Sequence, residues 1–320
     1  SLVCAGPDQE AAASLLLYAV GRRLLESRVA GLAAALLFAA HPIHTEAVAS
    51  LVGGRAELLA SVSVLGAWWL FLAGDDRSGR ARLLADLGSA GVFALGLLAK
   101  ENAAVLPGVL FLAGWVLRRR SARELLVRLA PHLAILAGYL FLRLVIIGGI
   151  TSMDRTIAFG DLPPADVFLG VMTILASYLR LVLIPWPLQD QLCYQDLPAR
   201  APAWLGLACT LLVVGLIAGT AWRAIRGRRA GRTPFAAFGL LLFFGCLFPV
   251  SHVVPFMVVM AERFCYLPSV AACLVAGWAF LELLRRGYRL PLVAGCLLLG
   301  GAAAALRQSP AVAVRVDVVL

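Results

Sequence analysis

Residues 83–117 read LLADLGSAGVFALGLLAKENAAVLPGVLFLAGWVL, a stretch in which only Asp86, Lys100 and Glu101 carry a charge. The hydrocarbon core of a bilayer is about 30 Å thick, and a helix needs about 20 apolar residues to cross it. The stretch is nearly twice that long, and Lys100 and Glu101 interrupt it near its middle. It therefore predicts two membrane helices joined by a hairpin.

The remainder of the chain has the same apolar character. Of its 320 residues, 62% are hydrophobic and 14% are charged, which excludes a water-soluble globular fold. The composition predicts an all-α polytopic membrane protein. The apolar segments are 10–21, 29–40, 56–73, 83–99, 102–117, 131–150, 167–185, 203–222, 234–251, 266–284 and 291–306.

The net charge of +10 indicates orientation in the membrane. Lys100 is the only lysine, so nearly all of the 28 cationic residues are arginines. Most of them lie in connections near 22–28, 77–82, 118–128, 223–232 and 285–289. Short Arg-rich loops stay in the cytoplasm, so these connections should share one side, with attraction to anionic lipid headgroups as a secondary effect. The positive charge therefore does not predict a nucleic-acid partner.

Whether the segment 167–185 crosses the membrane decides on which side each later connection lies. If it crossed the membrane, the basic connections at 223–232 and 285–289 would lie outside. We therefore expect a re-entrant or interfacial helix there, buried against protein within an outer-side region 151–202. About ten transmembrane helices remain in a single membrane domain over 1–310, and the tail 311–320 has no assignment.

Several common catalytic motifs are absent from the sequence. No GxxxxGK[ST], GxSxG, HExxH or GxGxxG motif occurs, which excludes a P-loop ATPase. The seven cysteines form no CxxC pair, so neither a zinc knuckle nor a redox dithiol is indicated. We predict no cofactor and no metal.

The densest polar stretch joins the second and third apolar segments. It reads HPIHTE at 41–46 and GGRAE at 53–57. Pro42 ends the preceding helix, and the glycines let the chain turn back. A hydrophilic loop facing headgroups and a metal site of the HxxH-plus-Glu type are both alternatives here. The titratable residues are His41, His44, Glu46, Arg55 and Glu57.

Charged pairs mark two further hairpins on the same predicted outer face. Lys100–Glu101 is one pair, and Glu262–Arg263 opens the helix that follows the Pro-containing stretch 248–255. A charge at the bilayer centre costs about 2.5–3.5 kcal/mol on insertion scales, so such residues usually face the protein interior.

Cations and carboxylates in one outer cavity suit transfer of a group from a lipid phosphate. The cations stabilise the departing phosphate, and a carboxylate deprotonates the acceptor hydroxyl.

These motifs resemble those of the transmembrane and tetratricopeptide-repeat O-mannosyltransferases and their bacterial relatives. The sequences HPIHTEAVA at 41–49 and GRAELL at 54–59 match one family signature, and FPVS…AERFCYLPS at 248–269 matches another. KEN at 100–102 and YLRLVLIP at 178–185 are similar to two further blocks in the expected order. The resemblance covers residues 11–306.

The resemblance implies a GT-C fold and transfer of a hexose, mannose in eukaryotic members, from a polyprenyl-phosphate carrier to a hydroxyl of a protein or glycan. The resemblance does not assign a role to each residue, and our hypothesis is that Arg263 and Lys100 hold the carrier phosphate, with Arg55 assisting. Glu46 or Glu57 would orient the acceptor or the sugar, and Glu46 is the one candidate catalytic base. The residues at family-motif positions are His41, His44, Glu46, Arg55, Glu57, Lys100, Glu101, Glu262 and Arg263.

The family pattern also extends beyond both ends of the chain. The acidic catalytic motif of GT-C enzymes is expected before Ser1 and the repeats after Leu320, so the chain is expected to be a fragment. A transporter or flippase of lipid-linked or anionic solutes is one alternative, and a non-catalytic membrane scaffold or remnant is another. The excess of Arg over Lys favours a bacterial inner membrane, with the endoplasmic reticulum membrane as the alternative.

Overall fold

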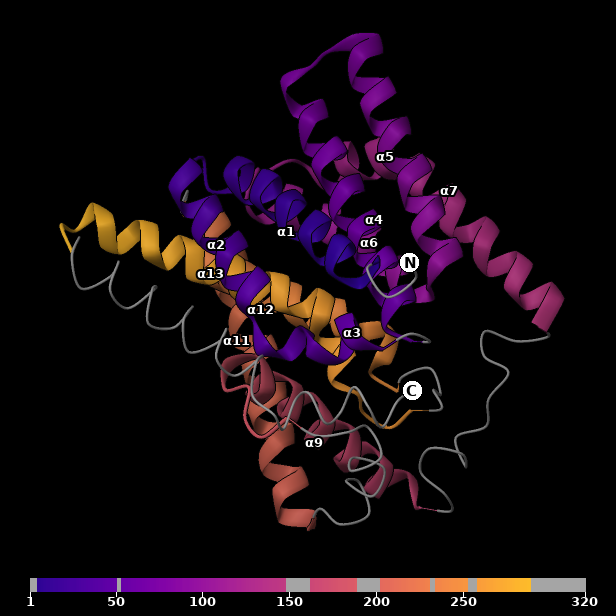
Figure 1. Ribbon diagram of the computed structural model, residues 1–320, viewed down its shortest axis with the longest axis vertical. Coiled ribbons are helices and arrows are strands. Elements are labelled where there is room, and N and C mark those ends of the chain that lie inside the picture. Colours follow the sequence, from indigo (N-terminus) through magenta and orange to yellow (C-terminus); the bar gives the residue numbers. More distant parts are fainter. Residues whose placement is uncertain are drawn as a thin grey trace. The chain divides into compact units, whose positions relative to one another are not determined.

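The computed structural model describes residues 5–50, 53–147, 162–188, 202–230, 234–252 and 258–288 (Figure 1). Throughout these ranges the chain forms helices and turns without any strand, which confirms the predicted all-α class. Its internal contacts divide it into two compact units. Unit 1 comprises Ser1–Ala103 and Ser269–Leu320, and unit 2 comprises Ala104–Pro268.

Unit 1 is built around a layer of neighbouring helices. α1 packs against α2 and α4, and α4 packs along α5 as an antiparallel hairpin (Figure 1). Its elements are α1 (Ala5–Leu24), α2 (Arg28–Ala40), η2 (Pro42–His44), α3 (Thr45–Ala49), α4 (Gly54–Ala73), η3 (Gly74–Asp76), α5 (Gly79–Ala99) and, apart from its first three residues, α13 (Tyr266–Arg285). The 3-10 helix η4 (Glu101–Val105) begins in unit 1 and ends in unit 2.

Small residues allow α2 to pack closely between α1 and α13. A Cβ atom on Gly31 would lie 2.7 Å from the backbone nitrogen of Arg22, and one on Gly277 would lie 2.6 Å from the carbonyl oxygen of Ala30. Close backbone approach at Gly is typical of helix packing in membranes. Any larger residue at these two glycines would push the helices apart.

The two ends of unit 1 differ in chemistry. At one end Arg23, in the last turn of α1, pairs with Asp76 after α4 at 2.5 Å. At the other end the first turn of α1 meets α3, because a Cβ atom on Gly6 would lie 2.5 Å from the carbonyl oxygen of Val48. The first two Arg-rich connections thus lie at one end, as the predicted alternation of sides requires, and the HPIHTE stretch lies at the other.

Unit 2 contains the helices of the middle of the sequence. α6 packs against α7 and α12, and α11 packs against α9 and α12. In α7 the guanidinium of Arg143 donates to the Tyr139 hydroxyl at 2.9 Å, so the two side chains share a helix face. The elements are α6 (Leu106–Val116), α7 (Ala122–Ile147), α9 (Pro164–Leu183), α11 (Ala203–Arg229), α12 (Phe235–Leu247), η6 (Phe248–Val250) and η7 (Glu262–Cys265).

The apolar helices make the chain a multi-pass integral membrane protein. By length and composition six of the described helices can cross a membrane, or seven if the pair Arg28–Ala40 and Pro42–Ala49, bent by 51°, is one span. This set is smaller than the predicted ten. α1 is too charged to qualify, since it carries Asp8, Glu10, Arg22 and Arg23. The helical stretches Glu101–Val116 and Phe235–Val250 are too short, and the predicted segment 291–306 lies outside the described residues.

α9 corresponds to the helix predicted at 167–185. It is among the six helices that meet the length and hydropathy criteria for a span. Its predicted position on the outer side therefore stays a prediction, as does the total of about ten spans.

Candidate functional site

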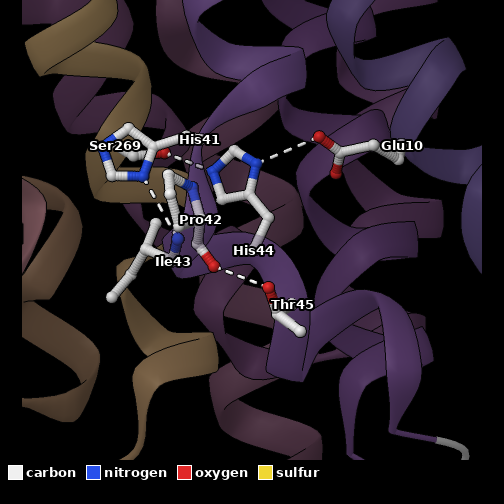
Figure 2. Close-up of polar contacts among 7 residues, drawn as sticks. All are labelled: Glu10, His41, Pro42, Ile43, His44, Thr45 and Ser269. Carbon is white, nitrogen blue, oxygen red and sulfur yellow. Dashed lines mark hydrogen bonds and ion pairs between the residues drawn. The ribbon is translucent and has the colours of Figure 1, made fainter. Parts of the chain in front are cut away.

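The HPIHTE stretch forms a tight corner at the end of α2. The backbone N–H of His41 donates to the Phe38 carbonyl at 3.0 Å, which ends α2, and the His41 Nδ1 accepts from the Ile43 N–H at 3.3 Å. Pro42 has no N–H to lose and starts the 3-10 turn η2. The Thr45 hydroxyl then donates to the Pro42 carbonyl at 2.7 Å (Figure 2).

His44 connects this corner to two helices that are distant in sequence. Its ring is fully buried, its Nδ1 lies 3.0 Å from Glu10 Oε1 of α1, and its Nε2 lies 2.8 Å from Ser269 Oγ of α13 (Figure 2). Glu10 and Ser269 were not among the predicted site residues. A carboxylate within the first apolar segment was the one sequence signal for Glu10. For Ser269 the one signal was its place as the last residue of the AERFCYLPS block.

The geometry gives no support to a metal site at the HxxH motif. Both ring nitrogens of His44 already face side-chain oxygens, so neither nitrogen is directed toward an open position. Among the residues that the structure describes, no group of three or more His, Cys, Asp or Glu side chains could hold a metal ion. The His44 side chain instead joins three segments by hydrogen bonds.

A second polar cluster forms where α4 begins and α5 ends. Glu57, which is 1% exposed, lies in the first turn of α4, where the helix dipole favours a negative charge. The Asn102 amide donates to both of its carboxylate oxygens at 3.0 and 2.9 Å, and Lys100 Nζ lies 2.6 Å from Oε2. The predicted residues Glu57 and Lys100 are therefore an ion pair, and Asn102 completes the cluster.

Three other predicted site residues lie in the same two regions, the corner at the end of α2 and the cluster where α4 begins and α5 ends. Glu46 is in the first turn of α3, Arg55 is in the first turn of α4, and Glu101 opens η4. Each is half-buried. They are thus more accessible than His44 and Glu57.

In unit 2 the predicted pair Glu262–Arg263 opens η7 and is held by α9. The backbone N–H of Ala261 donates to the Tyr178 hydroxyl at 3.3 Å, and Cys265 Sγ lies 4.0 Å from the Tyr178 carbonyl oxygen. Glu262 is buried and Arg263 is half-buried. Tyr178 therefore fixes both ends of the turn that carries the pair.

His252 follows η6 in an uncommon backbone conformation. Its φ angle is 57°, and its Nε2 lies 2.8 Å from the Val259 carbonyl oxygen. Burial lowers the pKa of this imidazole from its ordinary value, and the hydrogen bond to Val259 opposes that change. The neutral form of the His252 ring is therefore favoured at neutral pH.

Motif blocks that are far apart in sequence thus meet in space. His44 of the first block touches Ser269 across 225 residues of sequence. Glu57 touches Lys100 and Asn102 of the KEN block. In unit 2, Tyr178 touches the segment that precedes Glu262.

Comparison with known proteins gives the family of the chain. A scan against protein-family models finds no match. The chain is 34% identical over 257 residues to the Drosophila melanogaster protein O-mannosyl-transferase Tmtc2, covering 75% of this chain and 26% of that protein. It is 28% identical to Drosophila Tmtc3 over 79% of this chain and 32% of that protein. The human protein O-mannosyl-transferase TMTC4 is 28% identical over 87% of this chain and 42% of its own length.

The chain belongs to the TMTC-like family. The TMTC-like similarity extends over most of this sequence, in agreement with the family that its motifs resembled. The chain spans between 26% and 42% of the length of these three TMTC relatives.

Proposed function

We propose that the chain is the membrane part of a GT-C glycosyltransferase with about ten spans and α9 on the outer side. It moves a mannose-like hexose from a polyprenyl-phosphate carrier to a hydroxyl of a protein or glycan on the extracytoplasmic side. The names of the TMTC relatives, protein O-mannosyl-transferases, support the sugar and a protein acceptor. The observation that carries the proposal is the contact of Lys100 with the buried Glu57 and its partner Asn102.

Lys100 and Arg263 hold the carrier phosphate in this proposal, and Arg55 assists. The Lys100 side chain is 12% exposed, so its ammonium group is largely removed from water yet still accessible. In such surroundings a fixed cation stabilises the negative charge that develops on a departing phosphate much more than it would in water. The lipid tail of the carrier stays in the bilayer, beside the exposed apolar surface of the helices.

Glu46 is the better of the two candidate carboxylates for contact with the acceptor or sugar. Glu57 is buried and its oxygens are engaged by Asn102 and Lys100, whereas Glu46 is half-buried in the first turn of α3. A group that takes a proton from an acceptor hydroxyl must be within hydrogen-bond reach of it. Glu46 therefore remains the candidate base within this chain.

The test is formation of a new glycosidic bond. The intact protein is reconstituted in proteoliposomes with a polyprenyl phosphate that carries radiolabelled mannose, together with a Ser- and Thr-containing acceptor peptide. We expect label in covalent linkage to the peptide. Movement of label across the bilayer without such a bond would indicate a transporter and overturn the proposal, and so would the absence of both activities.

A further inference from the structure

Glu57 and Lys100 form a largely buried ion pair in which the charge of the carboxylate offsets that of the ammonium group. The carboxylate lies 2.6 Å from the ammonium nitrogen, and Asn102 directs its amide nitrogen at both carboxylate oxygens. Glu57 is 1% exposed, so water does little to screen its charge. An anion that binds Lys100 therefore comes under the influence of a fixed negative charge a few ångströms away.

This arrangement favours anions with a single negative charge. A phosphate that accepts a hydrogen bond from Lys100 is attracted by one positive charge and repelled by one carboxylate at slightly greater distance. In a site of reduced dielectric both interactions are large. For each negative charge on the phosphate, the attraction to Lys100 and the repulsion from Glu57 nearly cancel. A second charge on the phosphate therefore gains little attraction, while it loses more hydration on binding.

The proposed reaction changes the negative charge of the phosphate. The donor is a phosphodiester with one negative charge. Transfer breaks the bond between the anomeric carbon and the phosphate oxygen, which keeps the electron pair, and forms a bond from that carbon to the acceptor oxygen. The acceptor proton goes to a base. The product is a phosphomonoester whose second pKa is about 6, so it carries nearly two negative charges at neutral pH.

We propose that Glu57 makes the Lys100 site selective for the singly charged lipid phosphodiester over the doubly charged lipid phosphomonoester, so that the donor binds and the spent carrier leaves. This inference rests on the proposed function, in which Lys100 holds the carrier phosphate. It assigns Glu57 a role in charge discrimination rather than direct contact with sugar or acceptor.

The test compares the dissociation constants of farnesyl phosphate and its mannosyl ester with the intact protein in detergent. At about pH 8 we expect the ester to bind about tenfold more tightly, a ratio that corresponds to about 1.4 kcal/mol. At about pH 5 the monoester takes up a proton, and the preference should largely vanish in the unaltered protein. An equal affinity for both ligands at pH 8 would overturn the inference without any substitution.

Substitutions separate this inference from the proposed function. Glu57→Gln should abolish or reverse the preference at pH 8, because the carboxylate that offsets the charge of Lys100 is then gone. Asp76→Asn is the matched control, since it removes a carboxylate about 30 Å away along α4 and should keep the preference. Lys100→Met should weaken both ligands. If it weakens neither, the phosphate site itself is wrong; if it weakens both while Glu57→Gln keeps the preference, only the charge discrimination is wrong.

Discussion

The hydroxyl of Tyr178 in α9 accepts a hydrogen bond from the backbone N–H of Ala261 at 3.3 Å. Both residues are fully buried, and Ala261 directly precedes the charged pair Glu262–Arg263. The backbone turn that presents Arg263 is therefore held by a helix more than eighty residues earlier in the sequence. This contact gives the YLRLVLIP block a physical reason to accompany the AERFCYLPS block.

Replacement of this tyrosine by phenylalanine should impair turnover more than stability. Tyr178→Phe keeps the ring but leaves the Ala261 N–H without its acceptor, at a cost of about 1–3 kcal/mol that displacement of the turn can relieve. We expect kcat/KM for sugar transfer to fall about fivefold or more, with a small change in melting temperature. Tyr288→Phe, at a residue that is 56% exposed, is the control and should have no effect. Unchanged kcat/KM in Tyr178→Phe would contradict this role.

The hydrogen bonds of His44 should be coupled energetically. Ser269→Ala should lower stability by about 1 kcal/mol and His44→Ala by about 3 kcal/mol, because His44→Ala removes two buried hydrogen bonds, to Glu10 and to Ser269, at once. The double variant should lose less than the sum of the two, since the bond between them is lost only once. Thermal or denaturant unfolding in detergent measures the loss of stability in each single variant and in the double variant. Ser63→Ala is the control, because its hydroxyl donates to the Leu59 carbonyl of its own helix and joins no distant segment among the described residues. Strict additivity would refute the coupling.

The buried His252 should make stability fall at acidic pH. Burial lowers the pKa of its imidazole below the ordinary 6.5, so the unfolded chain binds a proton at a pH where the folded chain does not. The contribution of His252 to stability is therefore fully present above about pH 6.5 and is lost as the pH falls from there toward the lower folded-state pKa. Melting temperatures measured against pH for the native protein and His252→Asn should converge in acid. Parallel curves for the two proteins would show that His252 does not titrate in this way.

The predicted sides of the membrane can be tested by cysteine labelling in whole cells. A membrane-impermeant maleimide should label Ser50→Cys, at the end of α3, and should not label Ser78→Cys, between η3 and α5. Both Asp166→Cys and Trp186→Cys, at the two ends of α9, should react if α9 stays on the outer side. Labelling of only one of these two would mean that α9 crosses the membrane.

The helices could be predicted from the sequence because each one depends on a local property. Apolar segments of membrane length, with Pro or Gly at their ends, set the positions of α4, α5 and α13 to within a few residues. The count of spans could not be fixed in this way. Length and hydropathy do not tell whether a helix such as α9 crosses the bilayer or lies at its surface.

The candidate site was predictable in its residues but only partly in its contacts. Charges in an apolar chain drew attention to Glu57 and Lys100, and the structure pairs them. The partners Asn102, Ser269 and Glu10 depend on how helices pack, which is a long-range property. A neutral amide or hydroxyl in a helix has no local signature that separates a site residue from an ordinary one.

The most direct test of the account is donor-dependent sugar transfer by Lys100→Ala and Arg263→Ala in the intact protein, with Arg80→Ala as control. Arg80 is an exposed cation at the start of α5, at the opposite end of that helix from Lys100. We predict that each of the first two substitutions lowers kcat about a hundredfold or more, the loss that follows removal of one electrostatic contact to a developing charge, and that Arg80→Ala keeps full turnover. Normal turnover in both Lys100→Ala and Arg263→Ala would contradict the assignment of the lipid-phosphate site.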